Sequence, residues 1–538
     1  MRESVAVASG GLGTLDWVVI AAYFALLAGS GAFFAWRAKR RRSVESAEGY
    51  FLGAHAMPVW AVAISILATA QSAATFTGVP EQAYAGDISY LATNIGGVIG
   101  AVILAAVFIP AYYRLGVSTP YQLLERRFGP GAKLATSWAY MIGRVFASGS
   151  RVYIGAIPVS IAIFGDASST HLIISILAFM AFGTVYTLAG GITSVIWTDV
   201  IQVCVYLGAA VLAVVLLASK IDAPLSEVVD ALGSGGKEGA SKLLLVPTGF
   251  EGGGFDWSRE FSLPAILTGF VLLTLASHGT DQDLVQRMLT CKSKAAGSRS
   301  VIFGILVGVP AVALFLVLGL LLWIYYQRPE LMGSVRPSSS PGPASEVLLR
   351  YILSEMPAGA AGLMIAGVMA AGPAGINSGL NSMSSTFVSD VYRPWKPGRH
   401  EKHYVRVGRL GVVAWGLVLS AFALLCIPWK AASGQSIIGF VLSVMSFAYA
   451  GLLGVFFTAL FTRRGNTRSA IAALFAGFLV VLALRPEVAG AWTAWLEGVT
   501  QREVGSLAFK LAFPWQLTIG AAVAMAMCCA GARPKVLP

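Results

Sequence analysis

An acidic residue with a fixed set of neighbours stands near the start of a long apolar stretch in the middle of the chain. The stretch continues to about Leu217 and opens with the run Gly190-Gly191-Ile192-Thr193-Ser194-Val195-Ile196-Trp197-Thr198-Asp199-Val200-Ile201-Gln202. An acid in a membrane helix costs roughly 2.5–3.5 kcal/mol at the helix centre and less near the ends. The pattern therefore predicts that Asp199 faces a cavity, a cation or a partner. The competing interpretation is an interfacial Trp197 followed by a helix-capping Thr198-Asp199 pair.

The composition is that of a membrane protein with many spans. Of 538 residues, 56% are hydrophobic and only 12% are charged, against roughly 25% charged in a soluble domain. The formal charge of +12 does not indicate a nucleic acid partner, because the basic residues lie in loops between apolar stretches. The five cysteines lack metal or disulfide spacing, and no phosphate-binding loop is present. We therefore expect no cofactor, no ATP-driven transport and no enzyme activity.

Thirteen apolar stretches approach the length of about 20 residues that a membrane span needs. The fifth and sixth are joined by almost no loop, and the twelfth is short. The predicted fold class is an all-α polytopic membrane protein of about 13 transmembrane helices. The spans are 15–36, 58–80, 90–113, 134–164, 171–190, 192–219, 263–282, 300–327, 358–389, 406–428, 436–461, 469–485 and 513–531.

The charges in the loops predict the orientation of these spans. The loop after the first span is basic, and basic loops remain in the cytoplasm; it carries Arg37, Lys39, Arg40, Arg41 and Arg42. Alternation then places four further basic loops in the cytoplasm: 114–133, 287–299, 393–402 and 463–468. We expect an integral protein of the cell membrane with its N-terminus outside and its C-terminus in the cytoplasm.

Two spans carry interruptions in corresponding places. The second span has a small, hydroxyl-rich second half that ends at Pro80, and the seventh ends with Ser277-His278-Gly279-Thr280-Asp281-Gln282. These spans lie five apart and run in opposite directions in the predicted topology. Interrupted helices in inverted halves point to a transporter site at the bilayer midplane. For the second span alone, close packing through small residues is the alternative.

Together with the Gly-Gly, Trp-Thr-Asp and Gln pattern, several other stretches resemble the sodium:solute symporter family. They lie at 47–60, 75–84, 118–129, 281–287 and 380–392, so the resemblance covers about residues 45–465. It implies a leucine-transporter-like fold with two inverted five-helix repeats, and solute uptake driven by a sodium gradient. The implied division is an N-terminal helix and basic loop at 1–57, a first repeat at 58–219, an extracytoplasmic loop at 220–262, a second repeat at 263–461 and C-terminal helices at 462–538.

The resemblance also implies a sodium site between the first and eighth core helices. Its backbone carbonyls fall at Ala68 and Gln71, and its two hydroxyls fall at Ala374 and Gly375, which have none. Sodium is a hard cation that prefers oxygen ligands. The missing hydroxyls therefore weaken the expected site and put sodium coupling itself in question.

Three residues nearer the cytoplasm could compensate for this loss. In some family members the positions that match Asn377 and Ser378 form an additional cation site with the acid that matches Asp199. All three lie at similar depth in the predicted topology. A polar contact between helices is the alternative interpretation of Asn377 and Ser378.

Solute binds beside the first break in this family, which here implies Thr75, Asn94 and the Ser277-His278 break as substrate-binding positions. Asn94 stands where sugar-carrying relatives tend to have an acid, and this disfavours a sugar. His278 can titrate near neutral pH and relay a proton. A hydrogen-bonded structural histidine is the alternative.

Two arginines lie within the fourth span, Arg144 and Arg151, seven residues apart and so near one face of the helix. Burying either without an anion is expensive. Arg144 matches a basic family position that can meet a carboxylate substrate. An internal ion pair or an outward-turned side chain is the alternative. The sequence thus leans towards a small organic anion or zwitterion.

The leading hypothesis is a secondary active symporter, sodium-coupled, for a carboxylate, amino acid or sugar, working by alternating access. The first alternative is a carrier that has lost the main sodium site and is proton-coupled or uncoupled. The second is a membrane sensor of the same fold that does not transport. The predicted partners are a small solute, sodium or a proton, and the lipid bilayer.

Overall fold

The computed structural model describes residues 12–40, 46–188, 191–236, 239–251, 253–433, 436–485, 488–490 and 511–532. Throughout these ranges the regular secondary structure is helical, and no strand occurs. Gly190 of the Gly-Gly pair, and Arg41 and Arg42 of the first basic loop, lie outside the described residues.

Nine described helical segments are long and apolar enough to cross a bilayer, and a bent pair makes a tenth candidate. The nine are α1 (Thr14–Arg40), the segment Ser89–Leu115 with α5 (Thr93–Ile103) and α6 (Ile109–Leu115), α8 (Pro130–Phe164), α10 (Gly191–Ala218), the segment Leu263–Thr280 with α13 (Val271–Leu275), α15 (Lys294–Gln327), α17 (Ala360–Thr386), α19 (Glu401–Ser433) and α20 (Ile437–Phe461). Three shorter apolar helices, α9 (Ser169–Thr187), α21 (Thr467–Ala483) and α23 (Phe513–Cys529), coincide with predicted spans. The all-α polytopic class is confirmed, whereas the count of thirteen stays a prediction.

The bent pair is the predicted interruption of the second span. Helices α3 (Val59–Ala70) and α4 (Ala73–Ala85) meet at 63°. Gln71 between them has extended backbone angles, and Ser72 begins α4 with a capping box to Thr75. Because the capping box satisfies N–H groups at the new helix start, the chain can leave the helix at midspan and resume it at another angle.

The seventh span also breaks, but four residues later than the sequence suggested. Ser277 and His278 lie in the helical turn η6 (Ala276–Thr280), where the Ser277 hydroxyl donates to the Leu273 carbonyl over 2.9 Å. The extended residue is Asp281, whose carboxylate accepts from the Asp283 N–H and caps α14 (Gln282–Leu289). The predicted interruption is present, but its extended residue is Asp281 rather than Ser277 or His278, and the Asp281 carboxylate caps the helix that follows.

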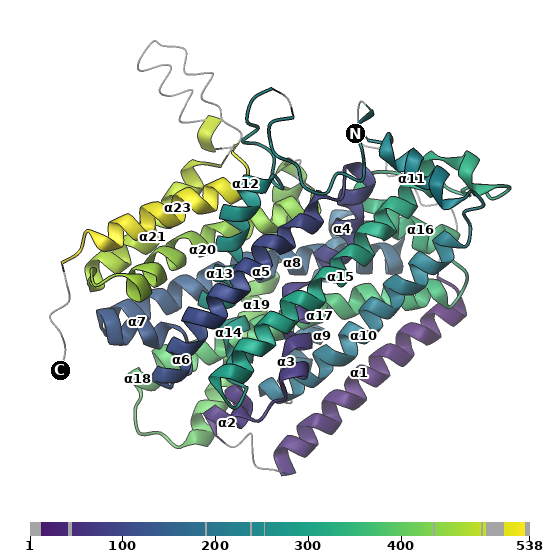
Figure 1. Ribbon diagram of the computed structural model, residues 1–538. Coiled ribbons are helices and arrows are strands. Elements are labelled where there is room, and N and C mark those ends of the chain that lie inside the picture. The colour runs from purple at the N-terminus through teal and green to yellow at the C-terminus, as the bar shows by residue number, and fades with distance from the viewer. Residues whose placement is uncertain are drawn as a thin grey trace.

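The broken helices lie inside the bundle. Helix α15 packs along both α3 and α4, and α10 packs along α17. Helix α1 covers one edge of the bundle, while α21 and α23 lie against α20 at the opposite edge (Figure 1). The helices that carry the predicted site residues are therefore surrounded by flanking helices.

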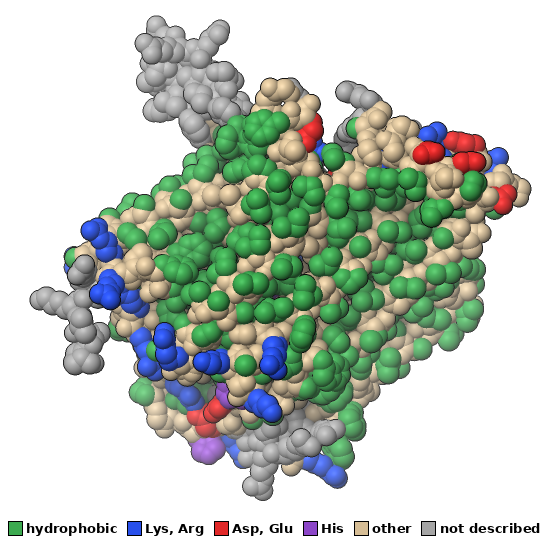
Figure 2. Space-filling view, viewed as in Figure 1, with side chains coloured by type: hydrophobic (Ala, Val, Ile, Leu, Met, Phe, Trp, Pro, Cys, Tyr) green, Lys and Arg blue, Asp and Glu red, His purple; other side chains and the backbone are tan. Residues whose placement is uncertain are grey.

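The surface separates charge along the direction of the spans. Hydrophobic side chains cover the visible face between the two ends (Figure 2). Basic side chains gather at the end that holds α6, α7 (Tyr121–Phe128) and α18 (Arg393–Trp395), and acidic ones at the end near α11 (Leu225–Gly233). This pattern is that of an integral membrane protein, and the cytoplasmic position of the basic end stays a prediction.

Candidate solute and cation sites

The Trp-Thr-Asp pattern lies within α10 rather than at its start. Gly191 has φ +60, and a Cβ there would lie 2.5 Å from the Tyr50 carbonyl oxygen, so only glycine fits. Trp197 stacks on Phe34 of α1, with ring centroids 5.7 Å apart. Asp199 follows two residues later and is 1% exposed. The capping interpretation fails, because Thr198 and Asp199 are interior residues of the helix.

All five predicted substrate-binding residues line one cavity of about 190 Å³, here called the solute cavity. It lies where the broken segments meet α5 and α8. The five are Thr75, Asn94, Arg144, Ser277 and His278. The structure therefore brings together residues that are far apart in the sequence.

Neutral polar groups face the solute cavity from two sides. The Asn94 amide nitrogen donates to the Leu91 carbonyl over 2.9 Å, which leaves its oxygen as an acceptor. Ser277 Oγ and His278 Nδ1 lie 2.8 Å apart. In the described part of the chain, the buried Nε2 of His278 has no hydrogen-bond partner. These groups can bind hydroxyls or a carbonyl of a polar solute.

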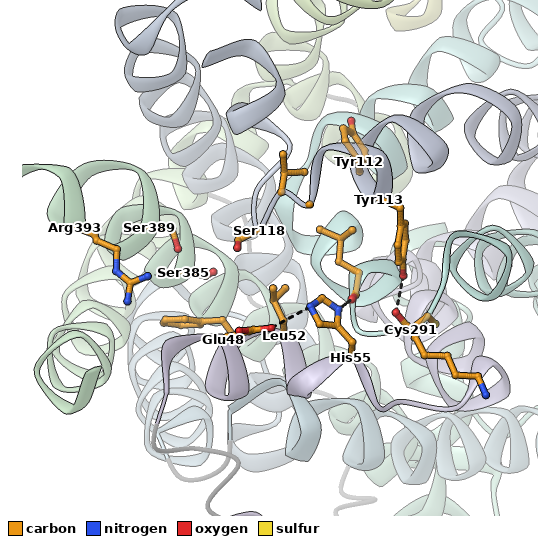
Figure 3. Close-up of a pocket in the computed structure, with 15 residues that line it drawn as sticks. Glu48, Leu52, His55, Tyr112, Tyr113, Ser118, Cys291, Ser385, Ser389 and Arg393 are labelled. Carbon is orange, nitrogen blue, oxygen red and sulfur yellow. Dashed lines mark hydrogen bonds and ion pairs between the residues drawn. The ribbon is translucent and has the colours of Figure 1, made fainter. Parts of the chain in front are cut away.

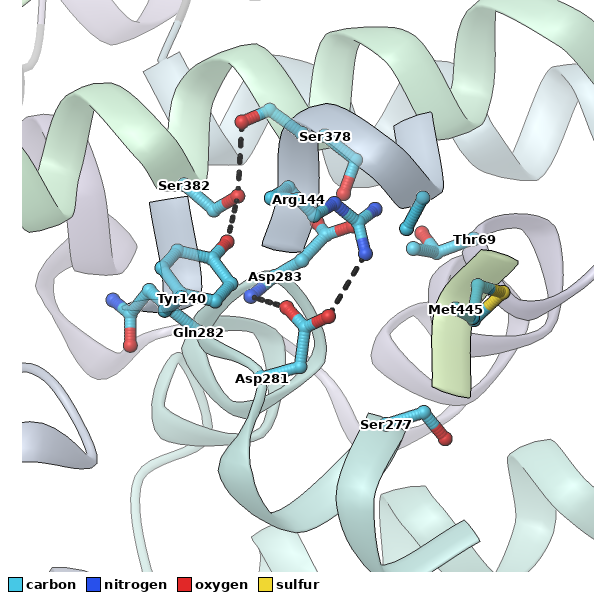
Figure 4. A network of polar contacts seen from close by, with 12 residues as sticks. Thr69, Tyr140, Arg144, Ser277, Asp281, Gln282, Asp283, Ser378, Ser382 and Met445 are labelled. Atoms are coloured by element: carbon cyan, nitrogen blue, oxygen red, sulfur yellow. Dashed lines mark hydrogen bonds and ion pairs between the residues drawn. The ribbon is translucent and has the colours of Figure 1, made fainter. Parts of the chain in front are cut away.

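The positive charge of Arg144 is balanced by two carboxylates of the protein. Its guanidinium donates to Asp281 over 2.9 Å and to Asp283, and all three side chains are buried (Figure 4). The Tyr449 hydroxyl donates to the same Asp281 oxygen over 2.9 Å. This geometry is that of the internal ion pair, and a direct bond from Arg144 to a substrate carboxylate stays a prediction.

Arg151 differs from Arg144 although it lines the same cavity. Its guanidinium donates to the Thr69 carbonyl over 3.2 Å and contacts the Met445 sulfur at 3.5 Å. Among the described residues no carboxylate lies within ion-pair distance of it, and its Nε has no partner. The spacing of seven residues from Arg144 drew attention to Arg151 in the sequence. The sequence did not show which of the two arginines would lack a carboxylate partner among the described residues.

Arg144 belongs to a larger group of charges that we call the ion network: Arg144, Asp199, Asp281, Asp283 and Arg287. Arg287 bonds to Asp199 and to Asp283, each over 3.0 Å. Every member is at most 3% exposed. Two arginines and three aspartates give the network a formal charge of −1. The sequence missed Arg287, which lies in a predicted cytoplasmic loop but folds into the bundle as part of α14.

Arg287 also occupies the place predicted for a second cation. It donates to Asp199 Oδ2 over 3.0 Å and to the Ser378 hydroxyl over 2.5 Å. Asn377 points elsewhere, since its side-chain oxygen accepts from the Thr187 hydroxyl over 3.0 Å. Asp199 and Ser378 are thus joined through a guanidinium, and the cation role of this trio stays a prediction.

The predicted main cation positions are brought together only in part. Ala68 and Gln71 line a small cavity of about 10 Å³, to which α17 contributes Ala370 and Ala371 among the described residues. Beyond its own stretch of helix, no atom of the described residues lies within 4 Å of where a Cβ of Gly375 would stand. The side chain of Ala374 lies outside the described residues. In the described part of the chain no cluster of His, Cys, Asp or Glu could hold a metal ion, so a cation here would need carbonyl, amide or hydroxyl oxygens.

A second large cavity, of about 510 Å³, opens at the basic end of the molecule (Figure 3). His55 lies at its wall, with Nδ1 2.5 Å from the Leu289 carbonyl and Nε2 3.5 Å from Glu48. Helix α14 connects the two cavities, because Leu284 lines the solute cavity and Leu289 lines this one. Arg287 comes from the part of α14 between those two residues, and Arg144 of the ion network lines the solute cavity itself.

Comparison with known proteins agrees with this geometry. The family model for the sodium:solute symporter family matches residues 50–477. The sodium/sialic acid symporter NanT of Aliivibrio fischeri is 30% identical over 484 residues, which is 88% of each chain. SiaT of Proteus mirabilis, another sodium/sialic acid symporter, is 29% identical over 480 residues, covering 88% of this chain and 90% of that one. The sodium/glucose cotransporter of Vibrio parahaemolyticus is 26% identical over 493 residues, covering 88% and 86%.

Solved structures show the same fold. A sodium-coupled sialic acid symporter in a substrate-bound outward-open state matches with a TM-score of 0.77 and 24% identity, covering 96% of this chain and 97% of that one. A nucleobase-cation-symport-1 family transporter in a closed conformation matches with a TM-score of 0.52. The leucine-transporter-like fold is thereby confirmed. The motif, the broken helices and these comparisons agree: this chain belongs to the sodium:solute symporter family, the sodium-coupled carriers of small solutes.

Proposed function

We propose that this protein imports a small organic anion with sodium, and that Arg151 binds the carboxylate of the solute. The observation that carries the proposal is the unmatched guanidinium of Arg151 in the solute cavity. A guanidinium away from bulk water is stabilised by an anion, and its planar fork suits a carboxylate. The neighbouring Arg144 is neutralised by two aspartates, so it offers a weaker field to a solute.

The remaining lining fits a hydroxylated acid. Thr75, Asn94 and Ser277 can exchange hydrogen bonds with hydroxyls, and His278 offers an unpartnered nitrogen. The cavity of about 190 Å³ is smaller than the roughly 300–1,000 Å³ usual for ligand pockets, so the solute is compact unless the cavity widens. Two relatives carry sialic acid, which is itself an acid. This supports a carboxylate over a neutral sugar.

The ion network supplies the inner barrier in this proposal. It ties α3, α8, α10, α14 and α17 together, and α14 reaches from the solute cavity to the cavity at the basic end. Opening towards the cytoplasm would require α14 to move away from α8 or α10. The same scheme places the N-terminus outside, the C-terminus inside, and the two inverted repeats at 58–219 and 263–461.

The test is solute uptake into proteoliposomes with sodium and proton gradients varied separately. Each acid is tested beside its methyl ester, and sialic acid is one of the acids. The comparison reports whether uptake needs a carboxylate. We expect sodium-driven uptake of an acid, little uptake of its ester, and at least a tenfold loss in Arg151→Gln. Arg126→Gln, which changes an arginine in a predicted cytoplasmic loop, serves as the control. Equal uptake of acid and ester with no effect of Arg151→Gln would refute the anion assignment.

A further inference from the structure

An apolar groove lies where α8 and α21 pack against α20, and α21 runs beside α20 in Figure 1. Its volume is about 450 Å³, within the roughly 300–1,000 Å³ usual for ligand pockets. We call it the lateral groove. Its walls come from the segments 135–146 of α8, 447–451 of α20 and 471–479 of α21, and every residue that lines it is apolar or glycine. The lateral groove is therefore a site for hydrocarbon rather than for a polar solute.

Small residues give the lateral groove its floor. A Cβ at Gly143 of α8 would lie 2.1 Å from the Cβ of Ala448 on α20. A Cβ at Gly451 would lie 2.7 Å from the Leu474 carbonyl oxygen of α21. Because larger residues cannot stand at these glycines without a shift of the backbone, α20 lies close to both neighbours and forms the bottom of the groove.

Large exposed side chains form its two rims. Trp138 and Ile142 stand four residues apart on α8 and are 41% and 54% exposed. Phe475 and Leu479 stand four residues apart on α21 and are 66% and 56% exposed. Residues four apart share one face of a helix. Both rims therefore face outward, where a membrane protein meets lipid.

The length of the lateral groove matches one leaflet of a bilayer. Its α21 wall extends over eight residues from Ile471 to Leu479, which is roughly 12 Å at 1.5 Å per residue. Half of a hydrocarbon core of roughly 30 Å is roughly 15 Å. Helix α21 begins at Thr467, four residues before this wall. The groove therefore runs inward from the end of the span over the depth that one acyl chain occupies.

The end of the groove nearest Thr467 carries positive charge. Arg463, Arg464 and Arg468 lie in or beside the connection between α20 and α21, and all three are exposed. Among the described residues no carboxylate lies within ion-pair distance of them. In the sequence the only acid within 121–164 and 437–483 is Glu125, which pairs with Lys133 over 2.7 Å. The charge of the three arginines is thus left for an external anion.

The backbone of this connection is held in place by other groups. The Arg127 guanidinium donates to the carbonyls of Thr462 and Arg464, over 3.1 and 3.3 Å. Asn466 begins α21 with a capping box to Ser469. Because these contacts use the backbone and not the exposed guanidiniums, the connection presents the arginines at a fixed place beside the groove.

We propose that the lateral groove binds one acyl chain of an anionic phospholipid, and that Arg463, Arg464 and Arg468 bind its phosphate. The planar fork of a guanidinium suits a phosphate, and basic clusters beside a span attract anionic headgroups. Helices α8 and α20 also line the solute cavity, through Arg144 and Tyr449 among others. The lipid therefore stabilises the packing of two helices that shape that cavity.

The test uses the full-length protein in detergent with three probes: dioleoylphosphatidylglycerol, dioleoylphosphatidylcholine with the same chains, and inorganic phosphate. Thermal unfolding is followed as each is raised, because a ligand of the folded state raises Tm with its concentration. We expect a saturable shift with phosphatidylglycerol alone. The triple variant Arg463→Gln, Arg464→Gln and Arg468→Gln should raise the concentration for half of that shift at least fivefold. Ala139→Phe, which fills the groove, should do the same.

Two matched controls should keep the wild-type midpoint. Lys292→Gln with Lys294→Gln and Arg299→Gln removes the same charge from exposed positions elsewhere on the basic end. Ala472→Phe adds the same bulk at an exposed position of α21 that does not line the groove. Because the arginines of the lipid site are exposed, their triple variant tests the inference even where Ala139→Phe does not fold.

Three results would overturn the lipid site. The first is an equal shift with both phospholipids, or a phosphatidylglycerol shift that neither the arginine variant nor Ala139→Phe changes. The second is a full shift with inorganic phosphate alone, which would show a site for a free anion. The third is a dimer, measured by light scattering, that Ala139→Phe dissociates while lipid has no effect, which would make the groove a contact between two copies. None of these measurements uses solute or sodium, so they are independent of the proposed function.

Discussion

The Arg287 guanidinium and the Asp199 carboxylate meet across 3.0 Å at the centre of the bundle, and each is only 1% exposed. Asp199 comes from the first half of the chain and Arg287 from the second. The Ser65 hydroxyl joins both, since it donates to Asp199 over 2.5 Å and accepts from Arg287 over 2.8 Å. The acid that the sequence singles out is thus held by an internal cation.

This pair predicts unequal effects of its two single substitutions. Arg287→Gln leaves Asp199 and Asp283 short of a buried counter-charge, which costs about 3–5 kcal/mol. Asp199→Asn leaves Arg287 bound to Asp283 and Ser378. We expect Arg287→Gln to lower Tm and yield sharply, and Asp199→Asn to keep expression while cutting sodium-driven uptake at least tenfold.

The double variant Asp199→Asn with Arg287→Gln tests whether the pair acts as a unit. Its Tm should exceed that of Arg287→Gln alone, because the second change removes the unpaired carboxylate. Tm and uptake would be measured for all four proteins. Additive losses of Tm would show that the two side chains do not depend on each other.

Arg144 should behave as a structural cation. Its substitution by Gln leaves Asp281 and Asp283 without their shared partner. We expect Arg144→Gln to lower Tm by more than Arg151→Gln does, while Arg151→Gln lowers uptake at near wild-type Tm. The measurement is thermal unfolding beside uptake for both proteins. A larger loss of Tm in Arg151→Gln than in Arg144→Gln would contradict this assignment and favour Arg144 as the anion-binding residue.

The missing hydroxyls at positions 374 and 375 make a further prediction. A Cβ at Gly375 would meet no atom of the described residues within 4 Å beyond its own stretch of helix, so a serine fits there. Ala374→Ser with Gly375→Ser adds two oxygen ligands beside the break, and we expect the sodium concentration for half-maximal uptake to fall at least threefold at fixed membrane potential. An unchanged value in the double variant would mean that these positions do not face the cation.

Much of this fold follows from patterns that are local in the sequence. Apolar runs of span length predicted the helices, and small, hydroxyl-rich residues predicted the break before Ser72. The five substrate positions came from the family resemblance, and they meet at one cavity. Pairing between distant charges was not predictable, because nothing near Arg287 in the sequence shows that α14 carries it to Asp199. The sequence likewise did not show that Arg144 forms ion pairs with Asp281 and Asp283.

The orientation of the molecule can be tested with single cysteines. Exposed positions His400 and Ser340 lie in loops predicted to be cytoplasmic and external. In a background without reactive native cysteines, we expect an impermeant thiol reagent added to whole cells to label Ser340→Cys and spare His400→Cys. Both should react after the cells are opened. Labelling of His400→Cys in intact cells would show that the predicted orientation is wrong.

Lys242 gives the stability of loop 220–262, which is predicted to be external, a pH dependence. Its ammonium donates to the carbonyls of Tyr84 and Gly86, at 3.0 and 2.8 Å, and so holds the loop on the end of α4. Burial lowers the pKa of Lys242 to about 8 from the ordinary 10.5. Between these values the unfolded chain holds a proton that the folded protein has released, so the contribution of Lys242 to stability rises as pH increases from about 8 to 10.5.

Lys242→Met removes this contribution. The difference obtained by subtracting the Tm of the variant from the wild-type Tm should therefore increase as pH is raised from 7 to 9.5. Thermal unfolding of the two proteins across that range measures the difference. Lys292→Met, at an exposed position on the basic end, is the matched control. The difference between its Tm and the wild-type Tm should stay constant across this pH range. A constant gap between wild type and Lys242→Met would mean that Lys242 keeps its ordinary pKa. The two carbonyl bonds would then hold the loop without any titration in this range.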